Sequence, residues 1–133
     1  MSFDLFLQNF QRGEIATFPR AVLETAFKGY LKEVDPEFFV LNFPDGGRSE
    51  LYTQSGPAIS DFMIARPAGS PELWRGLLDI LQRTNAVLFW PDGGAVVANE
   101  SVIQDLPQGL IKVAGVPTVV HEPEEIPRLI SAE

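Results

Sequence analysis

The chain has 133 residues, of which 45% are hydrophobic and 21% are charged, a balance that is typical of a folded domain and excludes a disordered chain. We therefore expect a single domain over residues 1–133. The net charge of −8, from 18 acidic and 10 basic side chains, disfavours nucleic acid and anionic membranes as partners.

Residues 1–37 predict a strand, a helix and an acidic turn. Apolar residues alternate over residues 2–8, as in a strand with one buried face. Over residues 19–31 an early proline precedes apolar residues at helical spacing, which predicts a helix. Pro36 disfavours helical geometry at the residue before it, so the helix is expected to end before this turn. The acids of the turn are Glu33, Asp35 and Glu37.

Three consecutive antiparallel strands are predicted next, over residues 38–43, 48–53 and 59–65. The first is apolar on both faces, which is typical of an interior strand. Between the first two strands, Pro44 and Asp45 favour a tight turn. That turn would be closed by Gly46 in the left-handed conformation.

The second half of the chain predicts one long helix and a set of short elements. Ser70 and Pro71 form a strong helix start, and leucines at helical spacing extend the helix over residues 71–84. Short strands and helical pieces follow. They are expected at 86–90 (strand), 95–98 (strand), 101–114 (two helical pieces), 116–121 (strand) and 124–130 (helical turn).

The order of these elements predicts an α+β fold with a mixed, largely antiparallel sheet. Helices are expected mainly on one face of that sheet, in a split β-α-β-like layout with extra strands. Residues 38–41 and 86–90 are expected to form neighbouring interior strands.

A short motif occurs twice in the sequence, at residues 41–47 and 88–94. Both copies end in Pro-Asp-Gly-Gly after an aromatic residue. Turn geometry alone explains every residue of the motif. It predicts left-handed conformations at Gly46 and Gly93. The alternative is a duplicated partner loop, with Asp45 and Asp92 as acceptors and Trp90 as an aromatic anchor.

The sequence contains no recognisable catalytic, cofactor or metal motif. There are no cysteines and only one histidine, His121, and neither a Gly-x-Ser-x-Gly elbow nor a glycine-rich phosphate loop is present. We therefore expect no cofactor, no metal and no catalytic residue. A small-molecule-binding domain or small hydrolase-type enzyme, with carboxylates and tyrosines such as Tyr30 and Tyr52 in a cleft, stays open as the alternative.

The expected location is the cytoplasm. No apolar run exceeds the five residues 86–90, far short of the roughly 20 that a membrane helix needs. The amino terminus lacks the basic and continuously apolar regions of an export signal.

The start of the chain, Met1-Ser-Phe-Asp-Leu-Phe6, followed by Gly13-Glu14 and Pro19-Arg20, resembles a group of small uncharacterised bacterial proteins. The resemblance implies no known activity, and no site residue is carried over from it. In size and charge such proteins are similar to toxin-immunity proteins.

These observations together predict a non-catalytic protein-binding module, such as a toxin-immunity or inhibitor-like protein, whose acidic surface covers a basic protein partner. A homodimer formed through an exposed edge strand stays open as well. The residues expected to bind the partner are Glu33, Asp35, Glu37, Asp45, Trp90 and Asp92.

Overall fold

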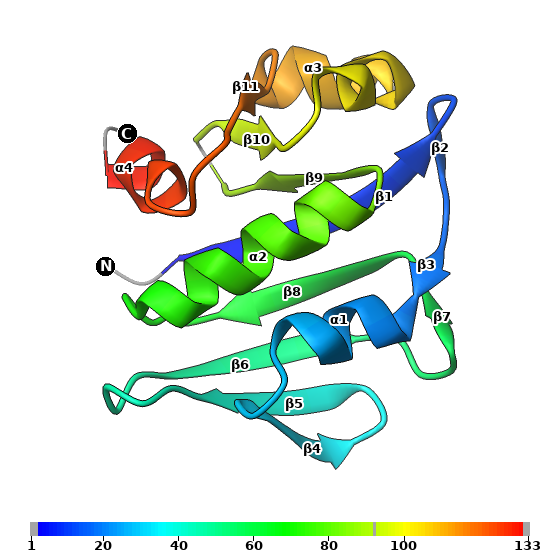
Figure 1. Cartoon of the computed structure of the whole chain (residues 1–133). Coiled ribbons are helices and arrows are strands. Elements are labelled where there is room, and N and C mark those ends of the chain that lie inside the picture. The colour runs from blue at the N-terminus through cyan, green and yellow to red at the C-terminus, as the bar shows by residue number, and fades with distance from the viewer. Residues whose placement is uncertain (1–2, 92, 132–133) are drawn as a thin grey trace.

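The computed structural model describes residues 3–91 and 93–131, which form one large mixed sheet with helices on both of its faces (Figure 1). The strand order is β11-β10-β9-β1-β8-β6-β5-β4, with β2 paired to the end of β1. All pairs are antiparallel except β10 with β11. The strands of this sheet are β1 (Asp4–Gln11), β2 (Glu14–Ile15), β4 (Leu31–Asp35), β5 (Phe38–Asn42), β6 (Arg48–Thr53), β8 (Asp61–Ala65), β9 (Ala86–Phe89), β10 (Ala95–Val97) and β11 (Thr118–Val119).

The remaining elements are short apart from one helix. A separate small pair joins β3 (Phe18–Pro19) to β7 (Ala58–Ile59). The helices are α1 (Arg20–Ala26), α2 (Pro71–Arg83), the 3-10 helix η1 (Glu100–Asp105), α3 (Gln108–Ala114) and α4 (Glu125–Ser131). The predicted α+β class, with its largely antiparallel mixed sheet, is confirmed.

The centre of the sheet is a split β-α-β unit. Helix α2 connects β8 to β9, and β1 lies between these two strands, antiparallel to both. Strands β8 and β9 are therefore parallel to each other. The unit depends on β1, whose alternating pattern buries Leu5 and Leu7 on the helix side.

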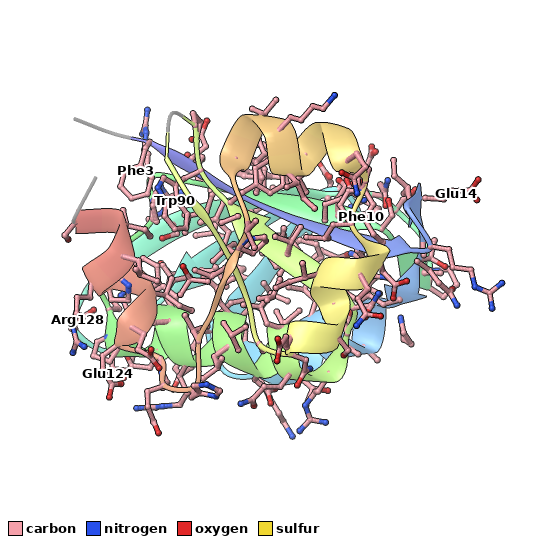
Figure 2. All side chains as sticks on the ribbon, turned by 90° about the horizontal axis from the view of Figure 1, so that it is seen from above. Phe3, Phe10, Glu14, Trp90, Glu124 and Arg128 are labelled. Carbon is pink, nitrogen blue, oxygen red and sulfur yellow. The ribbon has the colours of Figure 1, made fainter. Side chains whose placement is uncertain are left out.

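The helices divide the sheet into a covered face and a partly open face. Helices α1, α2 and α4 contribute Leu23, Leu77 and Ile126 to the main core, on one side of the sheet. On the other side η1 and α3 pack against β9 and β10, where Val87 and Val97 lie in a second, smaller core. Seen from above in Figure 2, α2 and α3 lie on opposite sides of the sheet. The expectation of helices mainly on one face therefore holds for three of the four α-helices.

Two expectations from the sequence are wrong. The helix over residues 19–31 ends at Ala26, because the chain turns at Gly29, whose φ is 91°. Residues 31–35 then form the edge strand β4 rather than only a turn. The strands at residues 38–41 and 86–90 are not neighbours, since β6, β8 and β1 lie between β5 and β9. In the described part of the chain, no helix has the length and apolar character needed to cross a membrane.

Candidate functional site

An apolar row crosses the open face of the sheet over five strands. Directly opposed residues on neighbouring strands share a face, so the register of the sheet aligns their side chains. The pairs are Phe89 with Phe6, Phe6 with Met63, Met63 with Tyr52, and Tyr52 with Phe38. We call the set Phe89, Phe6, Met63, Tyr52 and Phe38 the aromatic row.

Two aromatic stacks form the ends of this row. The rings of Phe6 and Phe89 are stacked with their centroids 5.6 Å apart, and those of Phe38 and Tyr52 are stacked at 4.8 Å. Tyr52 is 41% exposed, and the other members are half-buried. Helix α3 packs beside Phe89, but no helix of the described chain packs over the Phe38 and Tyr52 end of the row, so an apolar surface faces solvent there.

Two hollows adjoin the aromatic row. One, of about 370 Å³, has Phe6, Tyr52 and Met63 on its apolar side and the polar groups of Gln8, Gln54 and Asp61 on the other. The second, of about 450 Å³, lies at the Phe89 end. Its remaining lining residues are Phe6, Trp90, Pro91, Gly93, Leu110, Val113 and Ala114. Val113 on α3 is 88% exposed, so the apolar surface continues from the sheet onto this helix.

Carboxylates border the aromatic row on both sides. On one side of the row, Asp4 and Glu50 lie on the same face, each two positions along its strand from the row member. Both are opposite Ala65. In the other direction, Asp61 lies opposite Gln8. Asp61 accepts hydrogen bonds from Ser60 Oγ (2.9 Å) and Gln54 Nε2 (3.2 Å), which fix its position.

Two cations lie on the same face. Lys32 is opposite Val40, at the β4 end of the line of side chains that holds Glu50, and Arg48 is opposite Asn42, one line farther from the row. The two lines that border the aromatic row therefore hold three carboxylates and one cation, Lys32 at the β4 edge, and their net charge is negative.

The three acids predicted from the turn separate in the structure. Asp35 pairs with Phe38 and lies at the β4 end of the aromatic row, whereas Glu33 pairs with Phe39 on the helix side. The two acids point to opposite faces because β4 has an irregular register between them. Glu37 is exposed in the turn, and its amide nitrogen donates to Asp35 Oδ1 at 2.8 Å.

Glu33 is engaged by a buried cation. Its Oε1 lies 3.5 Å from Arg20 Nη2. Arg20 is only 8% exposed, donates to the carbonyl of Gln54 (2.8 Å) and lies 4.7 Å from the centroid of the Phe39 ring. Glu33 therefore has a structural contact that the sequence did not indicate.

The two echoed turns differ in what they do. Asp45 Oδ1 accepts from Ser70 Oγ (2.7 Å) and from the Gly47 amide (2.9 Å), and Gly46 has the predicted left-handed conformation with φ 88°. A Cβ at Gly93 would overlap the indole of Trp90, so the packing of this ring requires a glycine here. The left-handed conformation of Gly93 stays a prediction, because its φ depends on the preceding residue, which is not described. Trp90 is 6% exposed and belongs to the core. Asp92 lies outside the described residues.

The hollow that best fits the alternative, a carboxylate and tyrosine cleft, lies between α1 and α2. It has a volume of about 350 Å³ and includes Tyr30, Glu72 and Asp79 in its lining. Glu72 Oε1 is buried without a hydrogen-bond partner among the described residues. Asp79, in contrast, forms an ion pair with Arg83, with 2.9 Å between Oδ1 and Nε. Tyr52 lies on the opposite face of the sheet, so the two tyrosines do not meet.

Sequence reasoning missed most of the aromatic row. The available signal was the apolar character of Phe6 and Met63, at strand positions whose neighbours on both sides are buried. Within the described residues, no group of three metal-ligating side chains could hold an ion. No protein-family profile, curated protein or solved structure matches this chain.

Proposed function

We propose that this chain is a non-catalytic protein-binding module that docks a protein partner on the open face of its sheet. The observation that supports this most strongly is the aromatic row, which places five apolar side chains in register on a face where α3 packs only at the Phe89 end. Aromatic residues are enriched among the side chains that contribute most to binding at protein interfaces.

The charge around the row supports a basic partner, as in a toxin-immunity or inhibitor-like complex. Asp4, Glu50 and Asp61 border the row, and Asp35 lies at its β4 end. Carboxylates on an interface rim attract cations and accelerate association. Of the residues expected from the sequence, Asp35 and Glu37 keep this role, whereas Asp45 and Trp90 have structural contacts instead. The cytoplasmic location expected from the sequence is part of this proposal.

The test is a variant that removes one end of the row while retaining strand propensity, Phe38→Thr with Tyr52→Thr. Wild type and variant are used to capture partners from the host, and the captured protein is then purified and titrated against both. We expect the affinity to fall at least about tenfold, because truncation of two aromatic anchors at about 1 kcal/mol or more each exceeds the roughly 1.4 kcal/mol of a tenfold change.

The matched control is Ile15→Ser, which removes an exposed apolar residue that is 66% exposed on β2, away from the row. It should bind as wild type does. Thermal unfolding of all variants shows that the fold is intact. Equal affinities for wild type and the double variant would contradict the proposal. They would favour the hollow between α1 and α2 as the binding site.

A further inference from the structure

We infer that the element of the partner that occupies the aromatic row is a cationic amphipathic helix; this inference rests on the function proposed above. The row crosses β9, β1, β8, β6 and β5. With strands about 4.8 Å apart, the row is about 19 Å long. A helix rises 1.5 Å per residue, so about 13 helical residues would cover it. Three or four apolar side chains at i, i+3 or i+4 spacing would contact the row over that length.

The spacing of the carboxylates also matches a helix. Asp4 and Glu50 lie two residues from the row on one side, and Asp61 lies two residues from it on the other. Side chains two residues apart on a strand are about 6.6 Å apart, so the two borders are separated by about 13 Å. A helix with its side chains is about 10–12 Å wide. Lysine or arginine residues on both flanks of its apolar stripe would reach both borders.

The hollow at the Phe89 end gives the helix a place for one large side chain. It is open between Phe6 and Phe89 on the sheet and Leu110 and Val113 on α3, with a volume of about 450 Å³. Pockets of this kind receive the anchoring residues of helical partners. A leucine or an aromatic residue at one end of the apolar stripe fits this position.

Two other occupants fit the structure less well. A second copy of the chain carries a net charge of −8 and would place its own Asp4, Glu50 and Asp61 against the same carboxylates. A strand added to the sheet would use an edge rather than the row. The β4 edge is irregular between Glu33 and Asp35, which disfavours the pairing of another strand.

Methionine methyl labelling gives a direct readout of the row. The chain has two methionines, Met1 and Met63, and Met63 is the central member of the row. The ¹³C-methyl signal of Met63 is assigned with Met63→Leu. The probe is a synthetic peptide of about 14 residues, the length that covers the row, with a leucine stripe flanked by lysines. The comparison peptides carry glutamates in place of the lysines, or a proline in the middle of the same lysine peptide.

The lysine peptide should shift the Met63 methyl signal and bind at least about tenfold more tightly than either comparison peptide. Asp61→Asn with Glu50→Gln should weaken this binding several-fold and reduce its dependence on salt, whereas Glu14→Gln on the distant β2 should change neither. Sedimentation over a range of protein concentrations should show no association of the chain with itself through the row.

The outcomes separate this inference from the proposed function. Equal binding of all three peptides, or no shift of Met63 with any of them, would overturn the cationic helix. The proposal that a partner docks on the row would still be tested separately. That test compares wild type with the Phe38→Thr and Tyr52→Thr double variant in the capture of partners from the host, and it uses no peptide. If that variant bound the lysine peptide as wild type does, the peptide would lie elsewhere and the inference would also fall. A concentration-dependent dimer abolished by that variant would show that the occupant is a second copy.

Discussion

The hydroxyl of Ser70 donates a hydrogen bond of 2.7 Å to Asp45, and this contact ties the turn between β5 and β6 to the start of α2. Ser70 is 1% exposed and precedes the first residue of the helix. Its hydroxyl is therefore used between two elements that are distant in the sequence, and no cap of its own helix is formed. Asp45, expected from the sequence to contact a partner, has this internal role.

We predict that Asp45→Ala and Ser70→Ala each lower the free energy of unfolding. The double variant should be no less stable than the less stable of the two single variants. Both substitutions remove the same hydrogen bond, so their effects should not add. The measurement is the denaturant midpoint of the three variants and wild type. Partner binding should be unchanged. Additive losses would mean that the contact contributes little and that each residue acts separately.

Stability should fall in acid through two carboxylates. Hydrogen bonds from Ser70 and from the Gly47 amide hold the pKa of Asp45 below its ordinary value of 3.8. Hydrogen bonds from the amides of His121 and Glu122 likewise hold the pKa of Glu125 below 4.5. A carboxyl whose pKa is lower in the folded state contributes stability above its unfolded pKa and loses it as the pH falls through the folded pKa.

The expected result is a decrease in unfolding midpoint that begins near those ordinary values and continues below them. Glu125→Gln should be less stable than wild type near neutral pH and should show a shallower acid decrease, because one of the two groups no longer titrates. Denaturant unfolding from neutral to strongly acidic pH checks this. Parallel curves for the two proteins would show that Glu125 makes no pH-dependent contribution.

Gly76→Ala should destabilise the protein although alanine is the better helix former. A Cβ at position 76 would lie 2.7 Å from Phe27 Cδ1 and closer still to Cε1, at the contact between α1 and α2. Phe27 is fully buried and cannot move away freely. Overpacking of this kind costs about 1–3 kcal/mol.

The matched control for that substitution is Gly109→Ala. Gly109 lies in α3, and an added Cβ would meet nothing within 4 Å. Alanine should therefore leave stability unchanged or raise it, by up to about 1 kcal/mol. Chemical denaturation of both variants gives the comparison. A stabilised Gly76→Ala would show that the two helices separate at little cost.

The two acids of β4 should differ in their effect on binding. Asp35 lies at the end of the aromatic row, and Glu33 lies on the other face beside Arg20. Asp35→Lys should slow association with the partner or the lysine peptide and flatten its salt dependence. Glu33→Lys should change stability more than association, since it places a second cation beside the buried Arg20. Stopped-flow association and thermal unfolding separate the two effects, and equal changes for both variants would contradict the assignment of faces.

Local patterns predicted most elements of this fold. The proline and leucine pattern of α2, the turn between β5 and β6, and the two helical pieces η1 and α3 all depend on neighbours in sequence. Strand β4 could not be predicted in this way, because an edge strand with four exposed residues out of five carries no buried alternation.

The candidate site depends on contacts that local patterns do not contain. The apolar character of residues 38–43 predicted an interior strand buried on both faces, and Phe38 lies instead on the open face. Its alignment with Tyr52, Met63 and Phe6 follows from the pairing of strands that are distant in the sequence, such as those of Phe6 and Met63, which are 57 residues apart. A tight turn likewise predicted the geometry around Asp45 but not its bond to Ser70, 25 residues away.

The central position of β1 determines when the sheet can assemble during synthesis. This strand is synthesised well before its neighbours in the sheet, residues 61–65 and 86–89. The hairpins of β4, β5 and β6 can form as soon as they emerge, whereas Leu5 and Leu7 must wait for more than half of the chain. Among the strands of the large sheet, β1 therefore has the longest interval between its own synthesis and that of its last partner, and a chaperone could bind it during this interval.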